Sequence, residues 1–321
     1  MNFQLKVLLL SFVVSVILGA IIIPILRKLK VGQIERTDGP QSHLQKQGTP
    51  TMGGIIMALT MLLISGFLYW EYMKTEPDVA TRMIPLVFVT LGFGLVGFVD
   101  DFKKLVLKNT EGLKPAYKMI GLLIIAVAYT LYLVKYLNIG TETYIPILKE
   151  YITLPIWLYI PFAIFVLLGT TNAVNLTDGL DGLAAGLSAI AILVYGMIAW
   201  NSGWLAGYDD VAVFCFILVG GLLGFLVYNG HPAKVFMGDT GSLALGAVLA
   251  TLAILTHREM SLIVVGGVFV IETLSVILQV VWLRLFKHKL FLMTPLHHHF
   301  EEIGWRETDI IKLFWVVGFI L

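Results

Sequence analysis

Apolar runs about as long as a membrane is thick recur along the whole chain. They lie near residues 7–26, 53–70, 84–99, 119–137, 154–171, 183–200, 211–229, 241–256, 261–283 and 310–321. A helix needs roughly 17–25 predominantly apolar residues to cross a hydrocarbon core about 30 Å thick, and the last run is clearly shorter than that. We predict an all-α, polytopic membrane protein with about ten transmembrane helices, in a single integral membrane domain over residues 1–321.

Composition supports this class. Of the 321 residues, 58% are hydrophobic and only 13% are charged, whereas soluble domains carry about 25% charged residues. The one cysteine, Cys215, lies inside an apolar run, which excludes an intrachain disulfide or a cysteine metal cluster. The net charge of +1 indicates no particular partner, and we expect no nucleic acid among them.

The positive charges predict the orientation. Of the 22 lysines and arginines, sixteen lie on or beside the connections after the odd-numbered runs, and six lie on the other side. Because cytoplasmic loops carry an excess of these residues, the odd connections are expected in the cytoplasm and the N-terminus outside. Between the fourth and fifth runs, residues 141–155 contain short β-prone pieces, which predict a small hairpin on the outer side.

Five polar motifs all fall on those odd connections. They are QSHLQKQGTPTMGG at 41–54, the pair Asp100-Asp101 with five lysines after it, NAVNLTDGLDG at 172–182, HPAKVFMGDTGS at 231–242, and PLHHHFE at 295–301. The charge count did not use these motifs, so their agreement indicates one polar cleft at the cytoplasmic face. Carboxylates gathered there with lysines suit Mg²⁺ and phosphates, because Mg²⁺ prefers one or two carboxylates plus phosphate oxygens.

The motif at 172–182 joins two apolar runs. Asn172, Asn175, Asp178 and Asp181 are three residues apart, so neighbouring members share a face where the backbone is helical. A helix beginning near Gly182 would also offer N–H groups to a phosphate. Polar groups at the ends of spans are tolerated where they face water or a lined cavity. We interpret the motif as one wall of the cleft, since helix capping would explain one of the four residues better than all of them.

Other polar residues in these regions have simpler explanations that the sequence leaves open. Asp100-Asp101 also fits a solvated helix end, and Asp239 also fits the N-terminal cap of the next helix. Glu272, alone within the ninth run, is expected to pair inside the bundle rather than to react. Gln279, nearer the cytoplasmic end of that run, is a candidate for ligand contact.

His297, His298 and His299 are consecutive, so their side chains cannot all point the same way. A zinc site made of all three is therefore not expected, and the sequence has neither an HExxH nor a CxxC pattern to support a zinc enzyme. Hydrogen bonds from the imidazoles to phosphate or sugar groups are the expected role.

In their order, the five motifs resemble those of the bacterial phospho-N-acetylmuramoyl-pentapeptide-transferase (translocase I) family, within the polyprenyl-phosphate N-acetylhexosamine-1-phosphate transferase superfamily. The aspartate motifs are shared across the superfamily, whereas PLHHHFE and TPTMGG point to the narrower family. The resemblance covers nearly the whole chain, and only the short last run departs from it. It implies transfer of phospho-MurNAc-pentapeptide from UDP-MurNAc-pentapeptide to undecaprenyl phosphate, giving lipid I and UMP, the first membrane step of peptidoglycan synthesis.

The resemblance further implies Mg²⁺ as cofactor and a place in the bacterial cytoplasmic membrane, with the two substrates and the lipid bilayer as partners and a homodimer left open. By similarity, Asp239 would be the Mg²⁺ ligand that holds the diphosphate. Asp100 would prepare the lipid phosphate for attack, by removing its proton or by binding metal, and Asp101 would support it. One-step and covalent-intermediate mechanisms both stay open.

The resemblance also implies a substrate-binding set, in which Asn175, Asp178 and Asp181 contribute to the nucleotide pocket and Phe236 is available to stack on uracil. The set is Lys46, Thr51, Lys118, Asn172, Asn175, Asp178, Asp181, Phe236, Gln279, His297, His298 and His299.

Two other functions are weighed against this one. A sibling enzyme that transfers GlcNAc-1-phosphate from UDP-GlcNAc would leave the histidine motif unexplained. An ion-coupled transporter would place carboxylates near the middle of its spans and often repeat its halves, whereas the acids here gather at one face. A second Asp-Asp pair, Asp209-Asp210, lies on an outer connection without lysine or arginine, so we expect it to take no part in the chemistry.

Overall fold

The computed structural model describes residues 2–29, 46, 48–75, 77–105, 112–200 and 209–321. Part of the first polar motif (41–45 and 47) and Lys108 lie outside the described residues. The helices are α1 (Phe3–Lys28), α3 (Gly54–Thr75), α4 (Pro77–Leu105), α5 (Pro115–Leu131), α6 (Ile156–Thr177), α7 (Leu183–Ala199), α8 (Asp209–Asn229), α9 (Gly238–Leu255), α10 (Leu262–Val265), α11 (Gly267–Phe286), α12 (Leu296–Glu302) and α13 (Glu307–Ile320).

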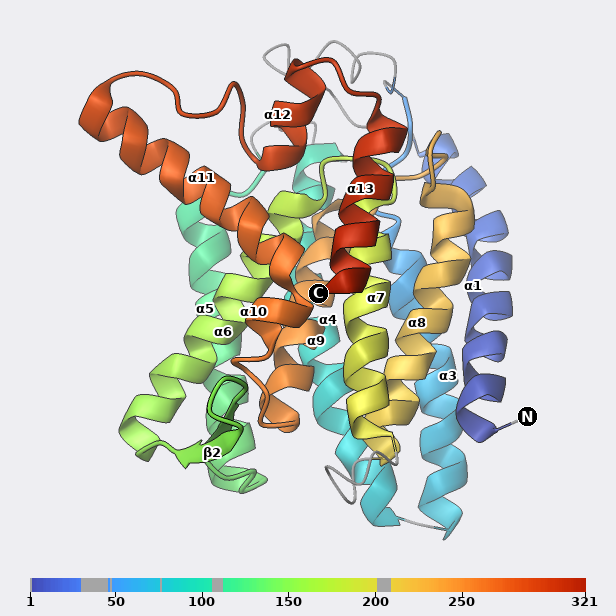
Figure 1. Ribbon diagram of the computed structural model, residues 1–321. Helices are drawn as coiled ribbons and strands as arrows, with labels where there is room; N and C mark the ends of the chain where they lie inside the picture. Colours follow the sequence, from blue (N-terminus) through green and yellow to red (C-terminus); the bar gives the residue numbers. More distant parts are fainter. Residues whose placement is uncertain (1, 30–45, 47, 76, 106–111, 201–208) are drawn as a thin grey trace.

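These helices confirm the predicted class. Among the described residues, eight helices are long and apolar enough to cross a membrane. Two of the ten predicted spans are shorter helices, α7 with 17 residues and α13 with 14. The predicted ninth span is divided at Gly266 into the short α10 and the long α11, and α11 leans outward from the rest of the bundle (Figure 1).

The middle of the bundle is α9. Every residue from Thr240 to Leu255 is buried, because α3, α4, α6 and α7 all pack against this helix. Its many alanines and glycines allow neighbouring backbones to come close, as is usual for helices packed inside a membrane. The outer helices instead carry exposed apolar side chains such as Ile21, Ile124 and Phe165, which suits contact with lipid.

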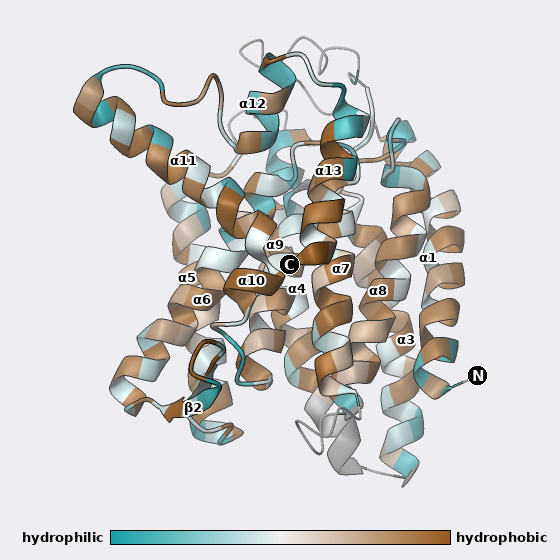
Figure 2. Cartoon of the chain, in the orientation of Figure 1, coloured by the Kyte–Doolittle hydropathy of each residue, from teal (hydrophilic) through white to brown (hydrophobic). Residues whose placement is uncertain are grey.

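The polar segments lie at the two ends of the bundle. Figure 2 shows hydrophobic residues along the length of the helices and hydrophilic ones around α12 and the beginning of α13. The N-terminal end of α1 lies at the opposite end of the bundle from α12 (Figure 1). The N-terminus and the polar motifs are thus on opposite sides, as the charge count predicts.

The predicted hairpin is confirmed. Strands β1 (Glu142–Ile145) and β2 (Glu150–Thr153) pair antiparallel, after a five-residue π-helical turn, η1 (Tyr132–Tyr136), that extends α5. The backbone N–H of Tyr144 donates to the carbonyl of His257, 2.8 Å away. This bond fastens the hairpin to the segment just beyond the C-terminal end of α9.

Candidate active site

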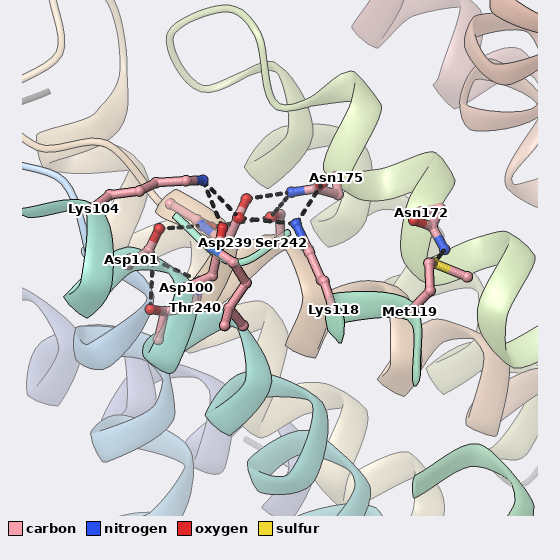
Figure 3. Close-up of polar contacts among 12 residues, drawn as sticks. Asp100, Asp101, Lys104, Lys118, Met119, Asn172, Asn175, Asp239, Thr240 and Ser242 are labelled. Atoms are coloured by element: carbon pink, nitrogen blue, oxygen red, sulfur yellow. Dashed lines mark hydrogen bonds and ion pairs between the residues drawn. The ribbon is translucent and has the colours of Figure 1, made fainter. Parts of the chain in front are cut away.

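The candidate active site lies where the C-terminal part of α4 crosses the N-terminal end of α9. Gly97 of α4 lies against the backbone of Asp239 so closely that a Cβ at Gly97 would overlap the Asp239 carbonyl. Asp100 and Asp101 follow about one helical turn later on α4. Carboxylate oxygens of Asp100, Asp101 and Asp239 lie within 4.8 Å of one another. The three acids that the sequence places on separate connections therefore form one group, named here the acid cluster (Figure 3).

Asp101 caps α9 from a different helix. Its Oδ1 accepts the backbone N–H of Asp239 at 3.2 Å, and its Oδ2 accepts the backbone N–H of Thr240 at 2.9 Å and the Thr240 hydroxyl at 2.6 Å. These N–H groups belong to the first turn of α9, where no intrahelical acceptor exists. The cap that the sequence offered as an alternative role for Asp239 is therefore made by Asp101, and the Asp239 carboxylate is turned to other partners.

Those other partners are two lysines and an amide. Asp239 Oδ2 accepts from Lys104 at 3.2 Å and from Lys118 at 2.9 Å, and its Oδ1 accepts from Asn175 Nδ2 at 2.8 Å. The same Asn175 amide also donates to the Ser242 hydroxyl at 2.8 Å. Side chains from α4, α5, α6 and α9 thus meet at Asp239 (Figure 3).

Asp100 is held by its own helix and by the loop that follows. Its Oδ2 is 2.6 Å from Lys104 Nζ, four residues later on α4, and its Oδ1 accepts the backbone N–H of Leu113 at 2.6 Å. The three carboxylates of the acid cluster are thus accompanied by two ammonium groups, those of Lys104 and Lys118, and the formal charge of the five groups together is −1. A set of carboxylate oxygens with residual negative charge fits a hard cation such as Mg²⁺, and the lysines beside it fit phosphate oxygens.

A second polar cluster lies beside the first, between the loop before α7, the loop before α9 and the start of α13. Lys46 Nζ is 2.7 Å from Asp181 Oδ1 and 2.6 Å from Glu307 Oε1. His231 Nδ1 is 3.1 Å from Asp181 Oδ2. Burial disfavours the charged Lys46 ammonium, but hydrogen bonds to the two carboxylates outweigh this and raise the pKa of Lys46. We call these four residues the lysine clamp.

Phe236 lies next to this clamp. The Lys46 ammonium is 6.0 Å from the centroid of its ring. The Phe236 backbone is fixed by hydrogen bonds to the segment before α3, in which Phe236 N–H donates to Pro50 and Gly53 N–H donates to Phe236, each at 2.8 Å. An aromatic face with a cation near it suits a planar, electron-rich ring such as a nucleobase.

Asp178 lies between the two clusters, at the C-terminal end of α6. Burial raises its pKa to about 8, with the negative charges of Asp239, Asp101 and Asp181 adding to the effect. Near neutral pH its carboxyl is therefore mostly protonated and able to donate a hydrogen bond.

The three consecutive histidines point to different partners. The backbone N–H of buried His297 donates to Glu272 Oε1 at 3.2 Å, and its Nδ1 is 3.2 Å from Glu272 Oε2. Glu272 thus has a buried partner, as expected, but this partner lies on α12 and not on another span. His298 Nδ1 is 2.7 Å from Glu301, and His299 Nδ1 accepts the backbone N–H of Leu292 at 3.2 Å. The His297 and His298 rings lie side by side, with centroids 4.2 Å apart, whereas the His299 ring faces Phe291. The three imidazoles therefore do not all point the same way, as their consecutive positions predict.

The His297 ring packs on the 172–182 motif. A Cβ at Gly179 would overlap this ring, so the glycine is what allows α12 to approach the loop between α6 and α7. The histidine motif and the asparagine–aspartate motif are therefore neighbours in the folded protein.

Three residues of the predicted substrate-binding set lie differently from the rest. Asn172 donates to Leu168 on its own helix at 2.7 Å and is separate from the acid cluster (Figure 3). Gln279 is engaged with the backbone of Leu290 and Phe291, so it fixes the loop after α11. Thr51 lies near Gly238, where an added Cβ would be 2.9 Å from its hydroxyl. Their contact with substrate stays a prediction.

Four residues that belong to the two clusters or contact them were not assigned a role from the sequence: Lys104, His231, Ser242 and Glu307. Lys104 carries a local signal, because a lysine four residues after Asp100 on a helix lies on the same face. Glu307 carries no such signal, since its partners are far away along the chain.

Comparison with known proteins identifies the family. A family model described as glycosyl transferase family 4 matches residues 83–257. Among curated proteins, the phospho-N-acetylmuramoyl-pentapeptide-transferases of Halalkalibacterium halodurans and Bacillus subtilis are 49% and 48% identical to this chain, each over 98% of it and over 93% and 94% of their own lengths. The chain belongs to the phospho-N-acetylmuramoyl-pentapeptide-transferase family. The enzyme of that name from Geobacillus thermodenitrificans is 49% identical over 97% of the chain.

The two clusters differ in how the matches cover them. The glycosyl transferase family 4 match spans α9 and most of α4, so it contains the whole acid cluster. Lys46 and Glu307 lie outside it and are covered only by the nearly full-length similarity to the pentapeptide transferases. The match thus contains the whole acid cluster but only Asp181 and His231 of the lysine clamp.

Proposed function

We propose that this protein transfers phospho-MurNAc-pentapeptide from UDP-MurNAc-pentapeptide to undecaprenyl phosphate, giving lipid I and UMP, with Mg²⁺ as cofactor. The family membership supports the reaction, and the acid cluster is the single structural observation that supports the chemistry. Three carboxylates and two lysines meet at the end of the bundle that carries the polar motifs. Phosphoryl transfer depends mainly on positioning and charge neutralisation, which such a group can provide.

In this proposal Asp239 would hold the Mg²⁺. Its carboxylate is not needed to cap α9, because Asp101 accepts the first backbone N–H groups of that helix. Bound there, the ion would neutralise charge on the diphosphate of the donor. Lys118 and Lys104 end in ammonium groups on flexible stems, so they can turn from Asp239 to phosphate oxygens without moving a helix. Asp101 keeps the first turn of α9, and with it Asp239, in place.

Asp100 would act on the acceptor. A polyprenyl phosphate oxygen attacks the phosphorus that bears the sugar, the bond from that phosphorus to the oxygen of UMP breaks, and UMP leaves. Asp100, with Lys104 beside it, would accept a proton from the lipid phosphate or bind metal. A one-step transfer and a path through an enzyme-bound intermediate both fit this placement.

We further propose that this end of the bundle faces the cytoplasm of a bacterium. The excess of lysine and arginine on the odd connections supports this orientation, because all five polar motifs lie on those connections. A nucleotide-sugar donor is cytosolic, and the phosphate of the acceptor lies at the membrane surface. The partners in the proposal are the two substrates and the bilayer, and association with a second copy stays an expectation from the resemblance.

The test is UMP release from UDP-MurNAc-pentapeptide by the full chain in detergent, with and without polyprenyl phosphate, and with and without EDTA. We expect UMP only when donor, acceptor and Mg²⁺ are all present. UDP-GlcNAc supplied as the donor separates the sibling function from this one. Faster UMP release from UDP-GlcNAc than from UDP-MurNAc-pentapeptide would contradict the proposal.

A further inference from the structure

Glu307 joins three segments of the site that are far apart in the chain. It lies in the first turn of α13, and its partners are Lys46 before α3, Asp181 before α7 and His231 before α9. Its side chain is only 9% exposed, although it belongs to a terminal turn of a helix at the polar end of the bundle. Removing a carboxylate from water in this place costs free energy, so the carboxylate needs cationic or hydrogen-bonding partners to compensate.

Each oxygen of Glu307 has a defined contact. Oε1 accepts from the Lys46 ammonium at 2.6 Å and from the backbone N–H of Asp181 at 2.8 Å, and Oε2 is 3.5 Å from His231 Nδ1. Asp181 completes the arrangement, because its own carboxylate binds Lys46 at 2.7 Å and accepts the backbone N–H of Ala233 at 3.0 Å. Lys46 is thus held between two carboxylates.

A metal ion is a poorer explanation of this cluster. Asp181, His231 and Glu307 have ligand atoms within 4.8 Å of one another, but the Lys46 ammonium binds both carboxylates and its side chain is only 14% exposed. Lys104, which binds two carboxylates of the acid cluster, is 37% exposed and can turn away more easily. The cation of the lysine clamp is therefore a side chain of the protein itself. What the cluster fixes is the position of that side chain.

We propose that Glu307 is a positioning residue for the nucleotide end of the donor, acting through Lys46 and through the backbone of Asp181. A lysine stem has many rotamers, and two carboxylates in fixed places select one of them. The selected rotamer keeps the ammonium 6.0 Å from the Phe236 ring centroid, beside the surface proposed for the nucleobase. This inference rests on the proposed function.

Glu307 acts on donor binding and is separate from the reacting groups. The acceptor phosphate is assigned to Asp100 and its lysine, and no contact joins Glu307 to the acid cluster among the contacts of the described residues. Loss of Glu307 should therefore weaken binding of the nucleotide and leave acceptor binding and the chemical step nearly intact. In a variant without the Glu307 carboxylate, the KM for the donor should therefore rise while kcat is nearly unchanged.

The chain offers a matched control for this test. Asp309 lies two residues later in the same first turn of α13, has a side chain that is 37% exposed, and pairs with Arg306 at 2.7 Å. Glu307→Ala and Asp309→Asn both remove one negative charge from the N-terminal turn of α13, so a helix-dipole effect is common to both. Only the first change removes a partner of Lys46.

For Glu307→Ala we expect the KM for UDP-MurNAc-pentapeptide to rise about tenfold, in line with the loss of a hydrogen bond to a charged group. We expect kcat to stay within about threefold and the KM for polyprenyl phosphate to stay unchanged. Glu307→Gln keeps an acceptor oxygen without the charge and should give an intermediate KM. Asp309→Asn should match the wild type in all three quantities.

UMP provides the readout of binding alone. At one UMP concentration, the rise in melting temperature should be smaller in Glu307→Ala than in Asp309→Asn and the wild type, because the stabilisation by a ligand grows with the logarithm of its concentration divided by Kd. Equal UMP shifts in all three proteins would overturn the inference, as would a fall in kcat with an unchanged donor KM. A wild type that binds UMP without turnover contradicts the proposed function instead, and the UMP shifts still test the role of Glu307.

Discussion

Acids lie at both ends of α9, but their surroundings differ. At the N-terminal end, the Asp239 carboxylate meets the ammonium groups of Lys104 and Lys118, whose side chains are 37% and 17% exposed. Just beyond the C-terminal end, Glu259 is 3% exposed and accepts the hydroxyls of Thr143 and Tyr159, each at 2.7 Å. Burial raises the pKa of Glu259, although these two hydrogen bonds oppose the effect.

A buried carboxylate therefore does not by itself mark a site of chemistry. Lysine ammonium groups on long, partly exposed stems can leave a carboxylate for a substrate phosphate. The hydroxyls around Glu259 are fixed on the hairpin and on α6, so they can only hold these elements to the end of α9. The exchangeable partners indicate function, and the fixed partners indicate stability.

The strongest test of this contrast is Asp239→Asn. We expect turnover to fall on the order of 10²-fold or more, because a neutral amide is a poor ligand for a hard cation and removes charge where a diphosphate must be neutralised. The melting temperature in detergent should change little, since Asp101 and not Asp239 caps α9. UMP release over a range of Mg²⁺ concentrations measures the effect, and near-normal activity at ordinary Mg²⁺ would remove Asp239 from the metal role.

The pairs Asp100-Asp101 and Asp209-Asp210 lie at opposite ends of the bundle, so matching substitutions in them test whether only one end takes part in the reaction. We expect Asp100→Asn to lower lipid I formation about 10²-fold, by analogy with the loss of one preorganised charged group. Asp210→Asn should keep activity within a few-fold of wild type, because Asp210 begins a span at the end of the bundle opposite the polar motifs. Asp209, the other member of the pair, directly follows residues 201–208, which lie outside the described residues. UMP release at matched expression compares them, and an equal loss in both would contradict the proposed orientation.

Glu259→Ala should reverse this pattern, with stability lost and activity kept. Two buried hydroxyls would lose their acceptor, and each such loss costs about 1–3 kcal/mol. The melting temperature should fall clearly, while turnover per folded molecule stays within about twofold of wild type because the acid cluster lies at the other end of α9. Glu150→Ala, which removes an exposed acid from the same hairpin, is the control. A loss of turnover at unchanged melting temperature would contradict a purely structural role for Glu259.

The last prediction concerns pH. The pKa of Asp178 is raised from 3.8 to about 8 by burial and then by neighbouring negative charges. Between those two values the folded protein holds a proton that the unfolded chain releases, so the stability linked to Asp178 is present at low pH and is lost as pH rises toward 8. Asp178→Asn cannot titrate and removes this dependence.

The melting temperature of wild type minus that of Asp178→Asn should therefore decrease between about pH 4 and about pH 8 and level off above that. Asp309→Asn serves as control, because Asp309 is exposed and Arg306 holds the pKa of its carboxyl below the usual value, outside that range. A difference that is flat in pH for Asp178→Asn would mean that this carboxyl is ionised throughout.

The fold followed from the sequence wherever a local property decides it. Apolar length predicts the spans, the lysine and arginine count predicts that the polar motifs share one end, and the β-prone pieces at 141–155 predict the hairpin. The break at Gly266 and the outward lean of α11 did not follow, because they depend on packing against other helices and not on hydropathy.

The sequence predicted most residues of the site, but it did not predict which of them contact one another. The sequence treats Asn175, Asp178 and Asp181 as one wall, yet Asn175 contacts Asp239 while Asp181 binds Lys46. The helix ends at Thr177, and the turn that follows carries Asp181 away from the face of Asn175. Glu307 was missed for a related reason, since its partner Lys46 is 261 residues away along the chain and only tertiary packing brings them together.

The backbone contact at Gly97 decides how the acid cluster responds to the membrane around it. Two helices that touch backbone to backbone cannot be pressed closer, so lateral pressure from the lipids finds no compressible side chains between α4 and α9. Such pressure acts instead on the periphery, above all on α11, with its lipid-exposed side chains. A bilayer whose thickness or fluidity changes with temperature would thus alter the surroundings of the site and leave the spacing of its three carboxylates unchanged.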